Sequence, residues 1–277
     1  MIDLHSHTNE SDGSSSPQQL IDEALRAGVE VLGITDHDTF TGIDLARDAA
    51  RQAGVELICG IELSTKLHGK SVHLLGYFPL EGALGPFRTW VLEQQASRRE
   101  RNGRLAKRLR ELGLDVTLEE AEALGKGMTG RPHFAKLLVD KGYVSNLRQA
   151  FDDYLDESAK GYVYRREPGF SEGVAAIRQA GGIASLAHPI RVHEDVPALM
   201  PELCSAGLNA LEAYHSDHGP AETELYLQLA RRYGLLVTGG SDYHGTMKPD
   251  VRLGTGCDGN LHVPPEVVDA LKAAAGR

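Results

Sequence analysis

The chain has 277 residues, of which 41% are hydrophobic, and its 29 lysines and arginines against 39 aspartates and glutamates give a net charge of −10. A chain of this length buries enough surface to fold without a disulfide or metal scaffold, so a metal site would serve chemistry, and the acidic balance disfavours a broad nucleic-acid-binding surface. The three cysteines, Cys59, Cys204 and Cys257, have no paired spacing, and no segment reaches the roughly 18 apolar residues of a membrane span. We therefore expect a cytoplasmic protein with no membrane attachment, and the sequence gives no reason to infer a stable protein partner.

The first 80 residues alternate short apolar runs with amphipathic segments, which is typical of parallel βαβ units. The expected strands span residues 2–4, 31–34 and 57–61, and the expected helices 17–27 and 43–53. A fourth strand at 72–78 is expected to follow a hairpin at 68–70. This order predicts an α/β fold.

The middle of the chain breaks the alternation and is locally basic, with 16 lysines and arginines against 12 acidic residues from Arg88 to Arg166. The expected helices span residues 90–112, 118–124, 134–141 and 147–155. We predict a helical insertion, a cap subdomain at residues 84–166. Between Arg98 and Arg110, arginines surround leucines at helical spacing, which favours a solvated outer face over a strand-binding surface.

The alternation resumes after Pro168. The expected strands span residues 183–186, 210–213 and 235–238, each preceded by a helix. Seven strands suit a TIM-like (β/α) barrel better than a short open sheet. We predict that residues 1–83 and 167–277 form this barrel.

Histidines and carboxylates fall where the expected strands begin or end. They are His5, His7, Asp36, His37, Glu62, His73, His188, Glu212, His215, Asp242 and His244. The carboxyl ends of barrel strands converge on one face, so these side chains would surround one cavity. Imidazoles mixed with carboxylates suit Zn²⁺, Mn²⁺ or Fe²⁺ rather than an all-oxygen Mg²⁺ or Ca²⁺ site.

The pair His5-Ser6-His7 places two imidazoles on the same side of an extended chain, where both can meet one ion. The same spacing also occurs in ordinary loops. His188 would equally suit the start of a helix, and Glu62 a solvated strand end. It is the repetition of the pattern after successive strands that favours a metal centre.

Seven ordered segments together resemble the PHP (polymerase and histidinol phosphatase) family. They are Asp3-Leu4-His5-Ser6-His7-Thr8, Ser11-Asp12-Gly13, Ile34-Thr35-Asp36-His37-Asp38-Thr39, Gly60-Ile61-Glu62, Val72-His73, Ala187-His188-Pro189 and Gly240-Ser241-Asp242-Tyr243-His244. The resemblance implies a distorted (β/α)₇ barrel with two or three divalent metal ions, Mn²⁺ ahead of Zn²⁺ or Fe²⁺, and phosphoesterase chemistry by attack of a metal-held hydroxide.

The resemblance also implies a set of ligands for each ion. The first ion would be held by His5, His7, Glu62 and Asp242, the second by Glu62, His73 and His188, and the third by Asp12, His37 and His244. Asp36 would orient a ligating imidazole.

Two further segments, Gly130-Arg131-Pro132-His133 and Glu212-Ala213-Tyr214-His215-Ser216, resemble a PHP subgroup that acts on nucleotides. By that resemblance, Arg131 and His133 contact a phosphate, Asp12 lies at the substrate, and His215 protonates the leaving oxygen. Without it, Arg131 is equally an ordinary surface arginine. We expect Asp217 and His218, which follow this segment, to be solvated.

These observations predict a metal-dependent phosphatase that removes the 3′-phosphate of a nucleoside 3′,5′-bisphosphate. A 5′-to-3′ exonuclease on short 5′-phosphorylated oligoribonucleotides would use the same chemistry. A histidinol-phosphate phosphatase, an amidohydrolase and a noncatalytic metal-bound binding module also remain open.

Overall fold

The computed structural model describes residues 1–79, 84–125 and 128–275. Its main sheet has seven strands in chain order: β1 (Ile2–Ser6), β2 (Val31–Ile34), β3 (Glu56–Leu67), β4 (Lys70–Tyr77), β5 (Ile183–Leu186), β6 (Ala210–His215) and β7 (Leu236–Gly240). Strand β4 is antiparallel to β3 and β5, and the other neighbours are parallel.

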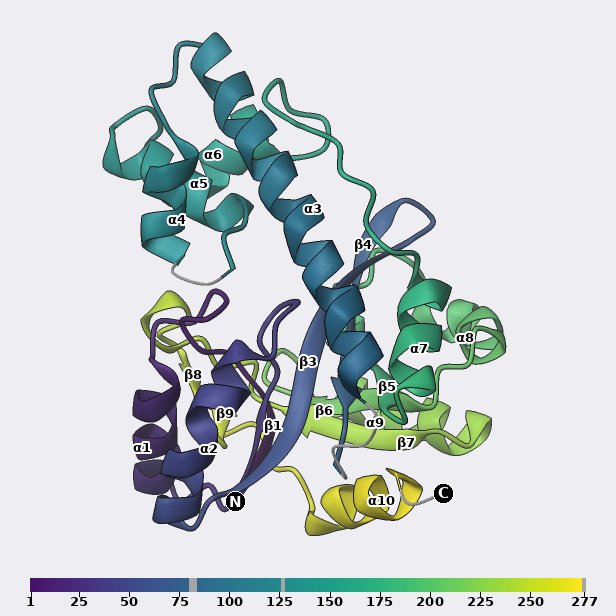
Figure 1. Cartoon of the computed structure of the whole chain (residues 1–277). Helices are drawn as coiled ribbons and strands as arrows, with labels where there is room; N and C mark the ends of the chain where they lie inside the picture. The colour runs from purple at the N-terminus through teal and green to yellow at the C-terminus, as the bar shows by residue number, and fades with distance from the viewer. Residues whose placement is uncertain (80–83, 126–127, 276–277) are drawn as a thin grey trace.

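The two edges of the sheet come together. The backbone N–H of His7 donates to the carbonyl of Tyr243 at 2.9 Å, and that of Asp242 donates to the carbonyl of His5 at 2.8 Å. The sheet is therefore a nearly closed barrel (Figure 1). This confirms the predicted seven-stranded, TIM-like α/β fold.

Helices cover the outside of the barrel. They are α1 (Pro17–Ala27), α2 (Thr41–Ala53), α7 (Phe170–Gln179), α8 (Val196–Ser205), α9 (Pro220–Tyr233) and α10 (Pro265–Ala275). Helix α1 shows why they form where they do: Ser16 and Gln19 make a capping box, Pro17 opens the first turn, and Gly28 ends the helix with a φ of 74°. A short hairpin of β8 (Val251–Arg252) and β9 (Gly256–Cys257) lies beside the barrel.

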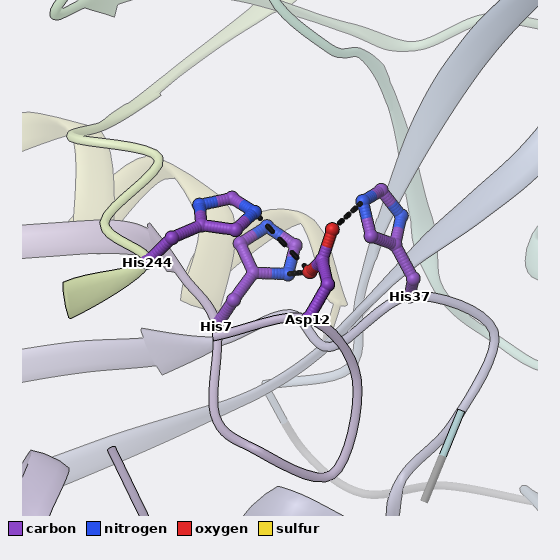
Figure 2. Close-up of side chains that lie close together, drawn as sticks. All are labelled: His7, Asp12, His37 and His244. Carbon is purple, nitrogen blue, oxygen red and sulfur yellow. Dashed lines mark ion pairs between the residues drawn. The ribbon is translucent and has the colours of Figure 1, made fainter. Parts of the chain in front are cut away.

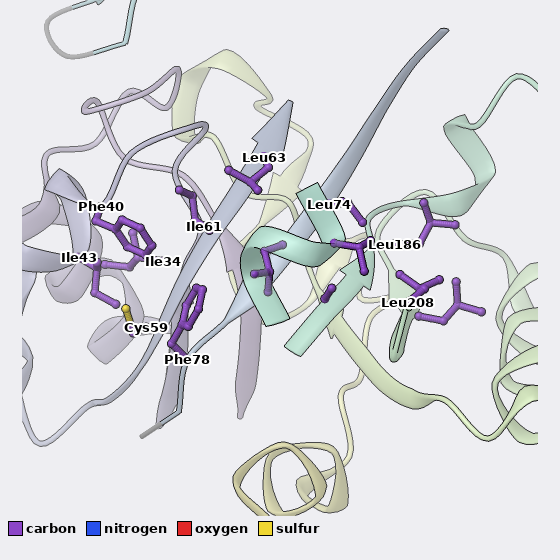
Figure 3. Packing of buried hydrophobic residues seen from close by; sticks show 14 of the residues in the cluster. Ile34, Phe40, Ile43, Cys59, Ile61, Leu63, Leu74, Phe78, Leu186 and Leu208 are labelled. Carbon is purple, nitrogen blue, oxygen red and sulfur yellow. The ribbon is translucent and has the colours of Figure 1, made fainter. Parts of the chain in front are cut away.

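The largest apolar cluster packs between the sheet and these helices, as Figure 3 shows for Ile34, Ile43 and Phe78. Phe87 joins this cluster from the first turns of α3 (Leu84–Glu111), and its ring lies 5.4 Å from that of Phe78. The base of α3 is thus anchored on the barrel. A second cluster fills the barrel interior and is closed by α10.

From that base, α3 rises to α4 (Leu118–Gly125), α5 (Arg131–Asp140) and α6 (Leu147–Ala150), which lie above the barrel (Figure 1). A π-helical turn, Phe151–Leu155, follows α6. This segment has its own apolar cluster, which includes Leu105, Leu109 and Phe134. The division of the chain into barrel and cap subdomain stays a prediction, because α3 packs in both clusters.

Two expected boundaries are each wrong by six residues. Strand β3 runs to Leu67 instead of ending at Ile61, because residues 60–67 pair with β4 as a long hairpin. Glu62 therefore points from the middle of a strand rather than following its end. Helix α3 begins at Leu84, six residues before the expected start. In the described part of the chain, no helix is both long and apolar enough to cross a membrane.

Candidate functional site

The predicted metal-binding residues meet at the end of the barrel that faces the helical insertion. All of them except His188, together with Glu212 and His215, form four overlapping groups, each with its imidazole and carboxylate ligand atoms within 4.8 Å of one another. The groups are His5, His7, Glu62 and Asp242; His7, Asp12, His37 and His244; His37, Glu62 and His73; and His5, Glu212 and His215. Six strands of the barrel or the loops after them supply these side chains.

The first group has the spacing of ligands around one ion. Nε2 of His7 lies 3.2 Å from Oε2 of Glu62 and 3.3 Å from Oδ1 of Asp242, and Nε2 of His5 lies 3.4 Å from each of these oxygens. Four ligands about 2.1 Å from a tetrahedral ion stand about 3.4 Å apart. Nε2 of His7 is buried with no hydrogen-bond partner. A buried ring nitrogen without a hydrogen-bond partner among such distances fits a metal ion better than a hydrogen-bond network.

The second group surrounds Asp12, whose carboxylate lies among three imidazoles (Figure 2). Oδ1 of Asp12 lies 3.2 Å from Nε2 of His244 and 3.6 Å from Nδ1 of His7, and Oδ2 lies 3.6 Å from Nε2 of His37. The predicted third set, Asp12, His37 and His244, is therefore brought together, with His7 added.

Glu62 faces two of these groups with different oxygens. Its Oε2 faces His5, His7 and His37, whereas its Oε1 accepts hydrogen bonds of 2.8 Å from both His73 and His188. The predicted second set is thus arranged around Oε1. A carboxylate whose oxygens point at two donor groups has the orientation of a bridging ligand.

Charge within the cluster already matches what metal binding requires, ionised carboxylates and some neutral imidazoles. Burial alone would raise the pKa of Glu62, but the nearby His37 and His73 hold it well below its usual range. Burial lowers the pKa of His37 to about 4, so this ring is neutral at pH 7. In His7, burial is outweighed by Asp242 and Glu62, which raise its pKa to about 9. Binding of a metal ion there must displace a proton.

The backbone at the site is locally constrained. His188 has a φ of 26° and Asp242 a φ of 57°, conformations that side-chain-bearing residues adopt rarely and that are often found at functional sites. Each is held by a hydrogen bond from its own N–H, from His188 to Oε2 of Glu212 and from Asp242 to the carbonyl of His5.

Glu212 is the carboxylate that the sequence did not assign. It is fully buried, and its Oε1 accepts from Nδ1 of His5 at 2.8 Å. A carboxylate on the far nitrogen of a ligating histidine fixes the tautomer that leaves Nε2 free for a metal. Asp36, for which this role was predicted, instead accepts from Thr8 and Ser11 and so shapes the loop that carries Asp12.

His215 lies in the cluster beside His5 and Glu212, and its role as the proton donor to the leaving oxygen stays a prediction. Its Nδ1 accepts from the N–H of Asp217, and its Nε2 lies 3.7 Å from Oδ2 of Asp242. The ring is buried and is not among the residues that line the two cavities at the metal-type cluster. The expectation that His218 is solvated is wrong: it is buried against Tyr226, and its Nδ1 donates to the carbonyl of Ala213.

Two adjoining cavities open above the cluster and share Asp12, His37, His73 and His133. One, of about 240 Å³, extends under the insertion to Arg98, Arg101 and Arg131. The other, of about 220 Å³, extends to residues of opposite charge to the cluster's carboxylates: Lys136, Arg191 and Lys248. The cluster thus lies between two cationic walls.

The predicted phosphate contacts line these cavities but have structural partners as well. Nη1 of Arg131 donates to the carbonyl of Leu155 at 3.2 Å, and Nδ1 of His133 accepts from the N–H of Gly130. Arg98 and Arg101, expected on a solvated face, are instead turned into the cavity, while Leu105 and Leu109 form the expected buried stripe. Arg98 pairs with Asp38, which ties α3 to the loop after β2.

Comparison with known proteins identifies this architecture. The PHP domain matches residues 3–160 of the chain. The chain belongs to the PHP family. A protein from Bifidobacterium adolescentis, described as a metal-dependent phosphoesterase, has the same fold with a TM-score of 0.83 and 31% identity, covering 99% of this chain and 98% of that one.

PHP relatives of known name cleave different phosphoric esters. A phosphoribosyl 1,2-cyclic phosphate 1,2-diphosphodiesterase of Eggerthella lenta is 36% identical over 88% of this chain and 94% of its own. A 5′-3′ exoribonuclease of Haemophilus influenzae is 34% identical over 87% of this chain and 89% of its own. A 3′,5′-nucleoside bisphosphate phosphatase of Chromobacterium violaceum is 32% identical over 88% of this chain and 87% of its own. The protein is therefore a PHP-family hydrolase of phosphoric esters.

Proposed function

We propose that this hydrolase removes the 3′-phosphate from nucleoside 3′,5′-bisphosphates, with 5′-nucleotides as products. The observation that carries the proposal is the position of the metal-type cluster between two cationic cavities. A ribose that carries phosphates at both positions can present one to the cluster and the other to a cationic wall. A single phosphate would leave one wall without an anion.

The chain would hold its metal ions through the three predicted sets: His5, His7, Glu62 and Asp242; Glu62, His73 and His188; and Asp12, His37 and His244. When bound, two or three ions lower the pKa of water and neutralise phosphoryl oxygens, and Mn²⁺, Zn²⁺ or Fe²⁺ suits these donors.

The protein's own side chains orient the ligands and the ester. Oδ1 of Asp242 faces the histidines, while its Oδ2 accepts from Nη1 of Arg191 at 2.8 Å and from Nζ of Lys248 at 2.6 Å. These two cations fix the carboxylate and line the second cavity, where they can donate to the oxygens of the reacting phosphate. His133 lines both cavities, and because its Nδ1 accepts from Gly130, its neutral ring carries the proton on Nε2.

A second candidate is 5′-to-3′ cleavage of short 5′-phosphorylated oligoribonucleotides. It is favoured by the cations of the second cavity, which could receive the strand that continues beyond the cleaved bond. Histidinol phosphate fits less well, because its ammonium group would face an arginine-rich wall.

The test measures hydrolysis of five substrates by the Mn²⁺-loaded protein, with EDTA-treated protein as control. The substrates are adenosine 3′,5′-bisphosphate, 5′-AMP, histidinol phosphate, a 5′-phosphorylated trinucleotide and a carboxamide. The proposal expects the highest kcat/KM for the bisphosphate and loss of turnover with EDTA. A higher kcat/KM for histidinol phosphate would refute the substrate class. If the metal-loaded protein is inactive on all phosphate esters, the noncatalytic hypothesis is supported. If it prefers the carboxamide, the amidohydrolase hypothesis is supported.

A further inference from the structure

The cavity under the insertion contains an arginine that has no hydrogen-bond or ion-pair partner among the described residues. Arg101 on α3 is 6% exposed, and its Nε is buried without a hydrogen-bond acceptor. Within the described residues, no carboxylate lies within ion-pair distance of its guanidinium. A buried charge without a partner costs folding free energy, so its presence indicates a ligand of opposite charge.

The surroundings of Arg101 strengthen this reasoning. The charged side chains that affect its pKa most are three arginines, Arg98, Arg131 and Arg165, and one acid, Glu167. Glu167 is already engaged, since its Oε1 accepts from Nη2 of Arg165 at 3.0 Å and its Oε2 lies 3.5 Å from Nζ of Lys66. Burial, followed by the field of Arg98, lowers the pKa of Arg101 to about 9, which still leaves it charged at neutral pH.

The cations near Arg101 differ in how far they are engaged. Arg98 gives its Nη2 to Asp38 and Ser64, and Arg165 gives Nη1 to the carbonyl of Gln94. Nε of Arg98, like that of Arg101, is buried without an acceptor. Both side chains line the same cavity as Asp12, His37 and His73 of the metal-type cluster.

We propose that Arg101, with Arg98 beside it, binds the phosphate of the substrate that is not cleaved and so determines specificity for a terminal 5′-phosphate. This inference rests on the proposed function and adds the residue that binds the uncleaved 5′-phosphate. A buried guanidinium forms bidentate, charge-assisted hydrogen bonds with a phosphate dianion.

The same subsite relates the two candidate activities. With a 5′-phosphate on Arg101 and the 3′-oxygen at the cluster, the bond cleaved is the 3′ ester of the first nucleotide. If the 3′ substituent is a phosphate, the reaction is that of a phosphatase. If the 3′ phosphate is joined to the next nucleotide of a strand, the reaction is that of an exonuclease and releases one 5′-nucleotide. In both cases water adds to phosphorus and the ester bond between phosphorus and one ribose oxygen breaks.

The variant Arg101→Met keeps most of the side-chain volume and removes the charge. Its matched control is Arg99→Met on the same helix, where the side chain is 71% exposed and pairs with Glu122. Both proteins, with wild type and Arg101→Lys, would be loaded with Mn²⁺ and assayed on adenosine 3′,5′-bisphosphate and on 3′-AMP, which lacks the 5′-phosphate.

Loss of a charged hydrogen bond predicts a KM for the bisphosphate that rises about tenfold to hundredfold in Arg101→Met. The kcat/KM for 3′-AMP should stay within about twofold of wild type, Arg101→Lys should recover part of the loss, and Arg99→Met should match wild type. Melting temperatures without substrate should not fall, because the variant removes an unpaired buried charge. Equal losses on both substrates, no loss, or a lower melting temperature with general loss would overturn the inference.

Binding of 5′-AMP measured by calorimetry separates this inference from the proposed function. If wild type hydrolyses neither substrate but binds 5′-AMP tenfold or more tightly than Arg101→Met does, the phosphate site stands and the proposed reaction fails. If both proteins bind 5′-AMP equally, the site itself is refuted.

Discussion

Replacing Glu212 with glutamine tests the arrangement that orients the metal-type cluster. Each of its two carboxylate oxygens accepts one buried donor: Nδ1–H of His5 at 2.8 Å and the backbone N–H of His188 at 2.6 Å. Glutamine has a similar shape but only one acceptor oxygen. In the variant, one of the two buried donors must therefore face an NH₂ group.

The expected magnitudes follow from these two hydrogen bonds. One unsatisfied buried donor costs about 1–3 kcal/mol, so the metal-free variant should unfold several degrees below wild type. A misaligned or wrongly protonated His5 should weaken Mn²⁺ binding by about tenfold to hundredfold, as for other partners of metal-ligating histidines. The kcat should fall with metal occupancy.

The assay is calorimetric titration of Mn²⁺ into metal-free protein, together with thermal unfolding of the same samples. Glu224→Gln is the control, because this glutamate is exposed on α9 and pairs with Arg231. Wild-type Mn²⁺ affinity and an unchanged melting temperature in Glu212→Gln would show that Glu212 does not orient His5 and would refute the reasoning.

Three further predictions concern the cluster and the barrel around it. His37→Ala and Asp242→Asn should each lose bound metal by elemental analysis and at least about a hundredfold of activity with an unchanged circular dichroism spectrum; full turnover in either would contradict the ligand assignment. Gly240→Ala should lower the free energy of unfolding by about 1–3 kcal/mol in urea, because an added Cβ would meet the backbone nitrogen of His5; wild-type stability would show that β7 yields there. In metal-free protein, burial raises the pKa of Glu212, but the nearby His5 outweighs this effect and lowers the pKa to about 2. Because the pKa is lower in the folded than in the unfolded protein, ionised Glu212 stabilises the fold at pH values above its ordinary pKa of about 4.5. This stabilisation is lost as the pH falls from 4.5 toward 2. The difference in unfolding free energy between wild type and Glu212→Gln should therefore narrow across that range. A gap that widens would contradict the pairing with His5.

The fold and the metal-type cluster were predictable because their signals are local. Each expected ligand belongs to a short segment at or near a strand, such as His5-Ser6-His7, and the alternation of strands and helices places such segments on one face of a barrel. The nine expected ligands are all brought to that face.

What sequence reasoning missed depends on contacts between distant segments. Glu212 was expected near the cluster, but it meets His5 across 207 residues, and its own segment does not show which histidine it orients. Arg101 belongs to a helix whose arginines lie all around its axis, so its spacing does not show which of them faces the cavity. Glu62 lies inside β3 because the hairpin with β4 extends the strand, and that extension depends on pairing rather than on local apolar pattern.

Which phosphate leaves adenosine 3′,5′-bisphosphate tests the central claim most directly. The measurement is chromatographic identification of the nucleotide formed by Mn²⁺-loaded protein during the first few per cent of conversion, when secondary hydrolysis is negligible. The account, with the 5′-phosphate held under the insertion and the 3′ ester at the cluster, predicts 5′-AMP and inorganic phosphate. Formation of 3′-AMP, or no release of phosphate from the bisphosphate, would contradict it.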